Sequence, residues 1–147
     1  EENLEEFIEK FEQYVNDNLD EISFVPEISV DMPLDLSDIT HSFLNNLKRF
    51  APFGPGNMEP VFQTDCVVDE GGGRIVGDKH LKCRVVYPDR SVQPLDVIAF
   101  NQKDKLPMIA NKKPFDLLYH VEENVWNNNV SIQLNVKDIR PNQRAEE

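Results

Sequence analysis

Three basic residues that alternate along one short segment are the side chains best placed for chemistry, and that chemistry is the binding of phosphate groups. The segment 80–87 reads HLKCRVVY, in which polar and apolar residues alternate with the period of a half-buried strand. The inner face would hold Leu81, Cys83 and Val85. The outer face would hold the candidate phosphate ligands His80, Lys82 and Arg84. The alternative interpretation is that Lys and Arg on this face serve only solubility.

The uneven distribution of charge decides how much weight these bases carry. The net charge of −12 argues against nucleic acid, because phosphate binding requires Lys and Arg to displace counterions. Residues 1–50, however, hold 13 acids and 3 bases, whereas residues 74–113 hold nine bases and four acids. We therefore predict a local basic surface on an acidic chain. On charge alone, this surface includes Lys103, Lys105, Lys112 and Lys113.

Trp126 is the aromatic residue most suited to stacking on a nucleobase. It lies in the polar sequence NVWNNN at 124–129, where Asn residues tolerate the left-handed backbone conformation of tight turns. A Trp in such a loop can stack on a base; the alternative is that it folds back over the end of the domain. Phe100 and Tyr119 are expected in the core or at its rim rather than as stacking residues.

The residue pattern contains no metal or catalytic motif. The three histidines share no metal-ligand spacing with one another or with Cys66 and Cys83, and these cysteines lack CxxC spacing. We expect both cysteines to be buried thiols in a reducing compartment. The chain has neither a Walker loop nor a GxSxG elbow. No catalytic residue, metal ligand or cofactor is therefore assigned.

The amino-terminal third is predicted to be helical at first and then extended. Apolar residues at helical spacing over 4–19 predict an amphipathic helix, and short strand-like runs follow at 22–25 and 28–32. The apolar stripe of this helix is too large to leave in water. We expect it to pack against the folded body of the chain or against a second copy, through which the chain would self-associate.

A second helix and a turn lead into the region that carries the basic residues. The helix is expected to run from a cap at Asp35 or Ser37 to Phe50, where Pro52 and the following glycines end it. The whole junction at 47–62 reads LKRFAPFGPGNMEPVF. It separates a helical pattern from a strand pattern and marks a module boundary.

Beyond this junction the period changes to that of strands. Strands are predicted at 61–68, 80–87, 92–100, 115–123 and 130–139, with one or two helical turns at 106–111. This order is typical of the OB-fold, a five-stranded Greek-key barrel that commonly binds oligonucleotides. We therefore predict a mainly β fold with some α structure, with the barrel at 57–141 and a tail at 142–147. An SH3-like barrel is the alternative from the pattern alone.

Four segments together resemble the RecJ family of single-strand-specific DNA exonucleases. They read FAPFGPGNMEPVF at 50–62, GDKHLKCRV at 77–85, ENVWNNN at 123–129 and IQLNVKDIRP at 132–141. The resemblance implies that residues 1–33 trail from the family's DHHA1 domain, that 34–56 form a linker helix and turn, and that 57–141 form its OB domain. One departure is the run of three Asn residues where the family often has Gly.

The resemblance also implies a function. The longer enzyme would degrade single-stranded DNA with Mn²⁺ or Mg²⁺ held by a DHH domain, whose motif does not occur in this sequence. For this chain it implies a non-catalytic module that binds single-stranded DNA, with His80 and Lys82 at a family motif. The alternative is a docking or channel-closing module that recruits single-strand binding protein. The sequence shows no membrane-spanning run and no signal segment, which predicts a cytoplasmic protein, and the resemblance implies that it is bacterial.

Overall fold

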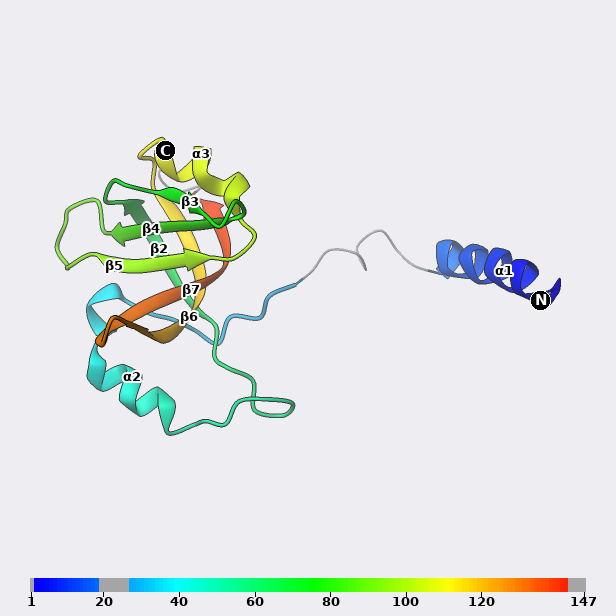
Figure 1. Cartoon of the computed structure of the whole chain (residues 1–147), viewed down its shortest axis with the longest axis horizontal. Coiled ribbons are helices and arrows are strands. Elements are labelled where there is room, and N and C mark those ends of the chain that lie inside the picture. The colour runs from blue at the N-terminus through cyan, green and yellow to red at the C-terminus, as the bar shows by residue number, and fades with distance from the viewer. Residues whose placement is uncertain (1, 19–26, 143–147) are drawn as a thin grey trace.

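Five strands form a closed barrel, as their alternating sequences predicted (Figure 1). The structure is a computed structural model and describes residues 2–18 and 27–142. The barrel strands are β2 (Phe62–Asp69), β4 (His80–Val86), β5 (Leu95–Ala99), β6 (Phe115–Trp126) and β7 (Asn129–Pro141). They follow the order β2-β6-β7-β5-β4, and β4 pairs back with β2 to close the barrel. The parallel pairing of β5 with β7 gives the Greek-key topology of an OB-fold.

Two short strands lie beside this barrel. β1 (Met32–Pro33) runs parallel to the start of β2, and β3 (Arg74–Val76) pairs with the first half of β4. The strand predicted at 28–32 is wrong except at Met32, because the preceding residues have no ladder partner beyond contacts of Asp31 with Val61. The strand-like run at 22–25 lies outside the described residues.

Two helices cover opposite ends of the barrel (Figure 1). α3 (Leu106–Ala110) follows the short helix η3 (Lys103–Lys105) at the position predicted between the third and fourth barrel strands, and its Ile109 is completely buried. α2 (His41–Lys48) buries Leu44 and Leu47 in the same hydrophobic cluster. The core of this fold therefore extends from the barrel onto the segment that precedes it.

The prediction of one continuous helix from Asp35 or Ser37 to Phe50 is wrong. Asp35 caps only a single 3-10 turn, η2 (Leu36–Asp38), and a separate α2 begins after Thr40. Thr40 has an extended backbone (ψ 166°), and its hydroxyl accepts a hydrogen bond from the Phe43 N–H. Thr at the N-cap satisfies a free helical N–H. The chain bends there because this bend turns Ile39 into the core.

Asn57 holds the turn that joins α2 to β2. Its side-chain amide donates hydrogen bonds to the carbonyl oxygens of Phe50 (2.8 Å) and Pro52 (2.9 Å). The backbones of Gly54 and Asn57 also exchange two hydrogen bonds of 2.9 Å. Gly56 has a φ of 83°, which a side chain would strain. The Pro- and Gly-rich junction is thus an ordered turn.

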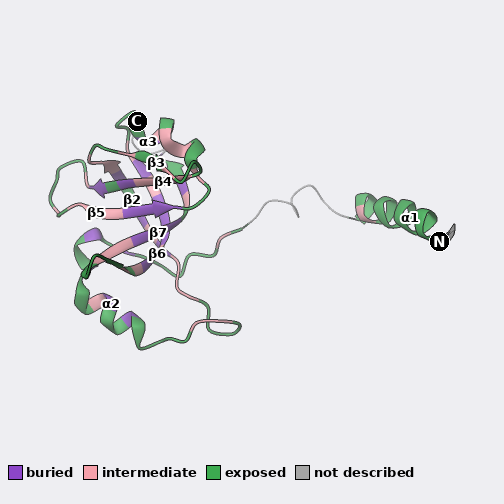
Figure 2. Cartoon of the chain, viewed as in Figure 1, coloured by how far each residue is buried: buried purple, intermediate pink, exposed green. Residues whose placement is uncertain are grey.

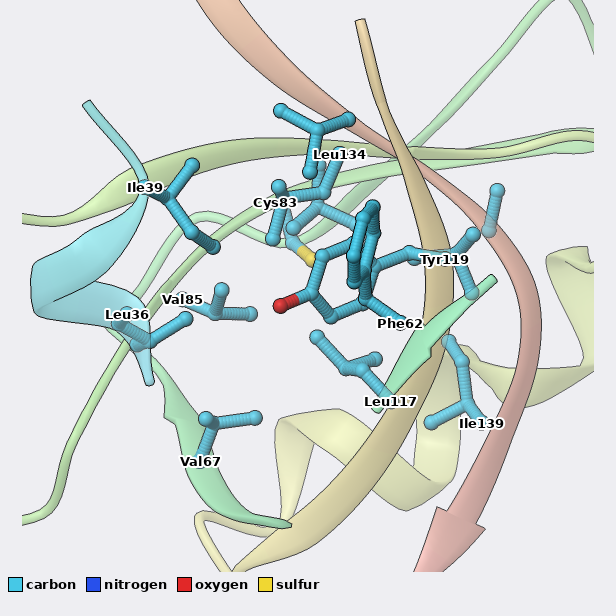
Figure 3. Packing of buried hydrophobic residues seen from close by; sticks show 14 of the residues in the cluster. Leu36, Ile39, Phe62, Val67, Cys83, Val85, Leu117, Tyr119, Leu134 and Ile139 are labelled. Atoms are coloured by element: carbon cyan, nitrogen blue, oxygen red, sulfur yellow. The ribbon is translucent and has the colours of Figure 1, made fainter. Parts of the chain in front are cut away.

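A buried hydroxyl network connects the barrel to the chain before it, and one of its members is Tyr119, which lies among the core side chains in Figure 3. The Thr64 hydroxyl donates to the carbonyl oxygen of Leu34 at 2.6 Å, so it accepts from the Tyr119 hydroxyl, also at 2.6 Å. Tyr119 is completely buried, as expected of a core residue, and burial raises the pKa of its hydroxyl. The network leaves neither hydroxyl unpaired inside the core.

The amino-terminal helix α1 (Glu2–Asn18) forms where the periodicity predicted it. The side chains of Leu4, Phe7 and Phe11 are each more than half exposed. Figure 2 shows most of this helix in the colour of exposed residues. An ion pair between Lys10 and Glu6 stabilises the outer face only weakly. The expected packing partner of this stripe does not lie within the described residues of a single chain.

The two cysteines differ, so the expectation of two buried thiols is wrong for one of them. Cys83 is buried in the interior of the barrel, whereas Cys66 is exposed. Cys66 sits in a β-bulge with a φ of 60°, and its N–H donates to Asp116. The bulge turns the side chain outward, which strict alternation along β2 does not predict.

Replacing Thr64 tests the buried network. We expect Thr64→Val to lower the free energy of unfolding by roughly 1–3 kcal/mol, because it leaves both the Leu34 carbonyl and the Tyr119 hydroxyl without a partner. Tyr119→Phe keeps the bond from Thr64 to Leu34 and should cost less. Urea denaturation of both variants measures the difference, and an equal or smaller loss for Thr64→Val would contradict the network.

Thiol modification tests the placement of the cysteines. Burial, with the charges of Asp69 and Asp96, raises the pKa of Cys83 from 9.0 to about 12. The contribution of the buried Cys83 thiol to the free energy of unfolding is complete below pH 9. It is lost as the pH rises toward 12, because between these two pH values the thiol ionises only in the unfolded chain. At pH 8 we expect Ellman's reagent to modify one thiol in the native chain and two in urea. Native Cys66→Ser should not react.

Candidate nucleic-acid interface

An open groove crosses the outer face of the barrel and collects several of the predicted residues. It has a volume of about 590 Å³ and runs across β3, β4 and β5 to the β6–β7 hairpin. Its charged and aromatic lining residues are Arg74, His80, Lys82, Asp96, Phe100 and Trp126. Its remaining lining residues are Val76, Ile98, Asn124, Asn129, Ser131 and Gln133. A groove of this shape and polarity can hold an extended anionic chain.

The alternation predicted for β4 is confirmed and explains how the groove is built. Leu81, Cys83 and Val85 are buried inside the barrel, while the intervening residues point outward. Cross-strand pairing then places Arg74 of β3 directly opposite Lys82. Among the described residues, no carboxylate lies within 4.0 Å of either side chain. Two like charges opposite each other are unfavourable until an anion binds between them.

Arg84 occupies a different environment from its neighbours on β4. It forms ion pairs with Glu70 at 3.0 Å and with Asp96 at 3.6 Å, and it does not line the groove. These carboxylates neutralise the charge of Arg84, which the sequence predicted to bind phosphate. Of the three side chains predicted on this face of β4, His80 and Lys82 line the groove and Arg84 does not, while Arg74 on the adjacent strand also lines it.

Trp126 projects from the end of β6 with 72% of its surface exposed. The following Asn127 and Asn128 have φ values of 48° and 62°, the left-handed conformations that the Asn run predicted. The tight hairpin pairs Trp126 with Asn129. The alternative that Trp126 folds back over the barrel end is thus wrong, and its indole is available for stacking.

Phe100 is a second exposed aromatic residue in the groove, which the sequence analysis expected in the core or at the rim. Half of the Phe100 surface is exposed. Its ring packs edge to face against the imidazole of His80, with the two ring centroids 5.0 Å apart. The N–H of Asn101 donates to Nδ1 of His80 at 3.0 Å, which holds the imidazole in place. Alternation along the predicted strand 92–100 is the signal that could have placed it, because Val97 and Ala99 face the core and Phe100 then falls on the outer side.

The four predicted lysines beyond β5 do not line the groove. Lys105 donates to the carbonyl oxygen of Ile139 at 3.2 Å and lies 3.8 Å from Asp138, so it stabilises the carboxyl-terminal strand. Lys103 belongs to η3, and Lys112 and Lys113 follow α3. These lysines lie close together in sequence, which suggested one basic surface. Their positions in η3 and after α3 instead place them at the end of the barrel that α3 covers.

A second, apolar groove of about 310 Å³ lies beside α2. The large apolar side chains that line it are Met32, Phe43, Phe50 and Phe62, and the other lining residues are Asp31, Asn46, Leu47 and Pro60. Phe50 is 67% exposed, which is unusual for a large apolar side chain. This surface is suited to an apolar protein segment rather than to phosphate.

The described part of the chain contains no group of three His, Cys, Asp or Glu side chains arranged to hold a metal. None of its helices has the length and apolar character needed to span a membrane.

Comparison with known proteins places this barrel in a family. The family described as the RecJ OB domain matches residues 30–138. The chain is 28% identical over 138 residues to the single-stranded-DNA-specific exonuclease RecJ of Salmonella typhimurium, covering 94% of this chain and 23% of that protein. It is 31% identical over 144 residues to RecJ of Haemophilus influenzae, covering 96% and 24%. The chain thus spans about a quarter of the length of these relatives.

Solved structures give the same fold. RecJ from Thermus thermophilus in complex with Mn²⁺ matches with a TM-score of 0.70 and 24% identity, covering 95% of this chain and 19% of that one. The same protein in complex with Mg²⁺ matches with a TM-score of 0.66 and 23% identity, covering 91% and 19%. At this level of identity the match establishes the fold.

Fluorescence of the indole tests the geometry of the groove, because Trp126 is the single Trp of the sequence. We expect acrylamide to quench the native chain almost as strongly as the chain unfolded in urea, since the side chain is largely exposed. Strong protection of the native signal would show that the residue is covered. Trp126→Phe serves as the blank.

Proposed function

The chain belongs to the RecJ OB domain family, and we propose that it is the module with which a single-strand-specific DNA exonuclease binds its substrate. The observation that carries the proposal is the groove, in which Arg74 and Lys82 lie opposite each other and Trp126 stands exposed. Phosphate contacts supply salt-dependent affinity for any nucleic acid, and base stacking favours single strands. The module itself is non-catalytic.

The acidity of the chain is compatible with this role because it is concentrated elsewhere. Nearly half of the 27 acids precede residue 51, and α1 carries much of that charge. In the groove, Asp96 is the single carboxylate among the described lining residues, and it is paired with Arg84. Short-range contacts in the groove are therefore cationic, while the acidic charge elsewhere in the chain is more distant and is largely screened by salt beyond about 10 Å.

We propose that the hydrolytic activity resides in a longer protein. The relatives carry the name of single-stranded-DNA-specific exonucleases and are about four times as long as the matched region. Mg²⁺ and Mn²⁺ are present in the T. thermophilus structures, but the described residues here do not fit such an ion. The metal would be held outside this module. The longer enzyme would lie in the bacterial cytoplasm, where its DNA substrate is found.

A docking function is the second candidate, and the apolar groove beside α2 favours it. Its exposed Phe50 and Met32 suit an apolar peptide segment, such as one offered by single-strand binding protein. The exposed stripe of α1 is a further apolar surface, which we propose is covered by a preceding DHHA1-type domain or by a second copy of the chain. Analytical ultracentrifugation tests self-association, and a Leu4→Glu, Phe11→Glu variant should be monomeric if α1 mediates it.

Binding of oligothymidylate tests the main proposal. Quenching of Trp126 should report binding at low salt, and affinity should fall as salt rises. Lys82→Ala should reduce the slope of log affinity against log salt by about 0.7, the value for one phosphate contact on a single strand. Lys137→Ala removes an exposed lysine outside the groove and should leave the slope unchanged.

The absence of binding at low salt would refute the proposal for this chain. The docking alternative predicts a different pattern: Phe50→Ser should abolish binding of a peptide with the carboxyl-terminal sequence of single-strand binding protein and leave oligonucleotide binding intact. Peptide binding without oligonucleotide binding would decide for docking.

A further inference from the structure

The groove is divided into two sides that differ in chemistry. The β3–β4 side carries both of its unpaired cations, Arg74 and Lys82. The β6–β7 side carries neutral polar groups, from Asn124, Asn129, Ser131 and Gln133, and ends at Trp126. A nucleic acid strand has a similar division, because its phosphates are anionic while its bases are neutral, flat and edged with hydrogen-bonding groups.

The cationic side is suited to the phosphates. Arg74 and Lys82 lie directly opposite each other in the β3–β4 ladder, so a phosphate between them would relieve their mutual repulsion. The carboxylate of Asp96 lies on the other side of β4, within 3.6 Å of Arg84. It would repel a phosphate that moved toward the middle of the groove.

The neutral side is suited to the bases. An amide or hydroxyl side chain offers both donors and acceptors, which match the edges of bases. The amides carry no net charge, so they attract a phosphate less strongly than the cations Arg74 and Lys82 do. Gln133 pairs with Asp96 across the parallel β5–β7 ladder, so this neutral row begins at the floor of the groove and leads toward Trp126.

We propose that a single strand lies in the groove with its phosphodiester backbone along β3 and β4 and its bases directed toward β6 and β7. The proposal rests on the proposed function and adds the orientation of the bound strand. It assigns Arg74 and Lys82 to the backbone, and Gln133, Ser131 and Trp126 to the bases.

A comparison of two ligands against two sets of variants tests this orientation. The ligands are fluorescein-labelled oligothymidylate and an abasic oligonucleotide of equal length, measured by anisotropy at low salt with the full 147-residue chain. Lys82→Ala should weaken the binding of both ligands by the same factor. Gln133→Ala should weaken oligothymidylate by roughly twofold to tenfold, the effect of one hydrogen bond, and leave the abasic ligand unchanged.

Two further variants support the comparison. Trp126→Leu should weaken only the base-bearing ligand, by roughly fivefold or more, because a stacked base is lost. Ser131→Ala is a milder change on the same side and replaces Gln133→Ala if that variant fails to fold.

The outcomes distinguish failure of the proposed function from failure of the proposed orientation. If the wild-type chain binds neither ligand, the proposed function is wrong. If it binds oligothymidylate but not the abasic ligand, or if Gln133→Ala weakens both ligands equally, the orientation is wrong while the function stands. A loss for Lys82→Ala that is confined to the base-bearing ligand would reverse the assignment of the two sides.

Discussion

Closure of the barrel is the constraint on which the rest of the structure depends. When β4 pairs back with β2 and β5 lies parallel to β7, every barrel strand has one side facing the interior. Residues must then alternate between the core and the outer surface. The groove follows from this closure, because Lys82 is outward where Leu81 and Cys83 fill the core. A slip of one residue along β4 would bury its basic residues.

The pattern of hydrophobic residues was sufficient to predict the barrel and the outer face of β4. The five strands share one small interior, so period-two alternation is strong wherever a strand is buried on one side only. Departures from that rule were not predicted. Cys66 is exposed because a bulge interrupts the alternation, and the expected single helix breaks at Thr40 because the core requires Ile39. Both features depend on contacts between residues far apart in sequence.

The candidate site was predictable in part for a similar reason. His80 and Lys82 lie on one strand, so their common face follows from alternation, and the Asn run after Trp126 specifies its own turn. Arg74 could be grouped with Lys82 only once the register of β3 against β4 was known. The pairing of Arg84 with Glu70 and Asp96 likewise involves two neighbouring segments. Charge counted along the sequence therefore overestimated the basic surface near β5, and it could not place Arg74 opposite Lys82.

Because β3 lies outside the closed barrel, the two cations of the groove are held by different numbers of strand pairings. Lys82 belongs to a strand that is paired on both edges, with β5 on one and with β2 and β3 in succession on the other. Arg74 stands on three residues that pair only with β4, and Gly71 and Gly72 before it have φ values of 118° and 114°. Displacing β3 would break its short ladder and no barrel pairing. The position of Arg74 is therefore held by this three-residue ladder, whereas that of Lys82 is held by the closed barrel.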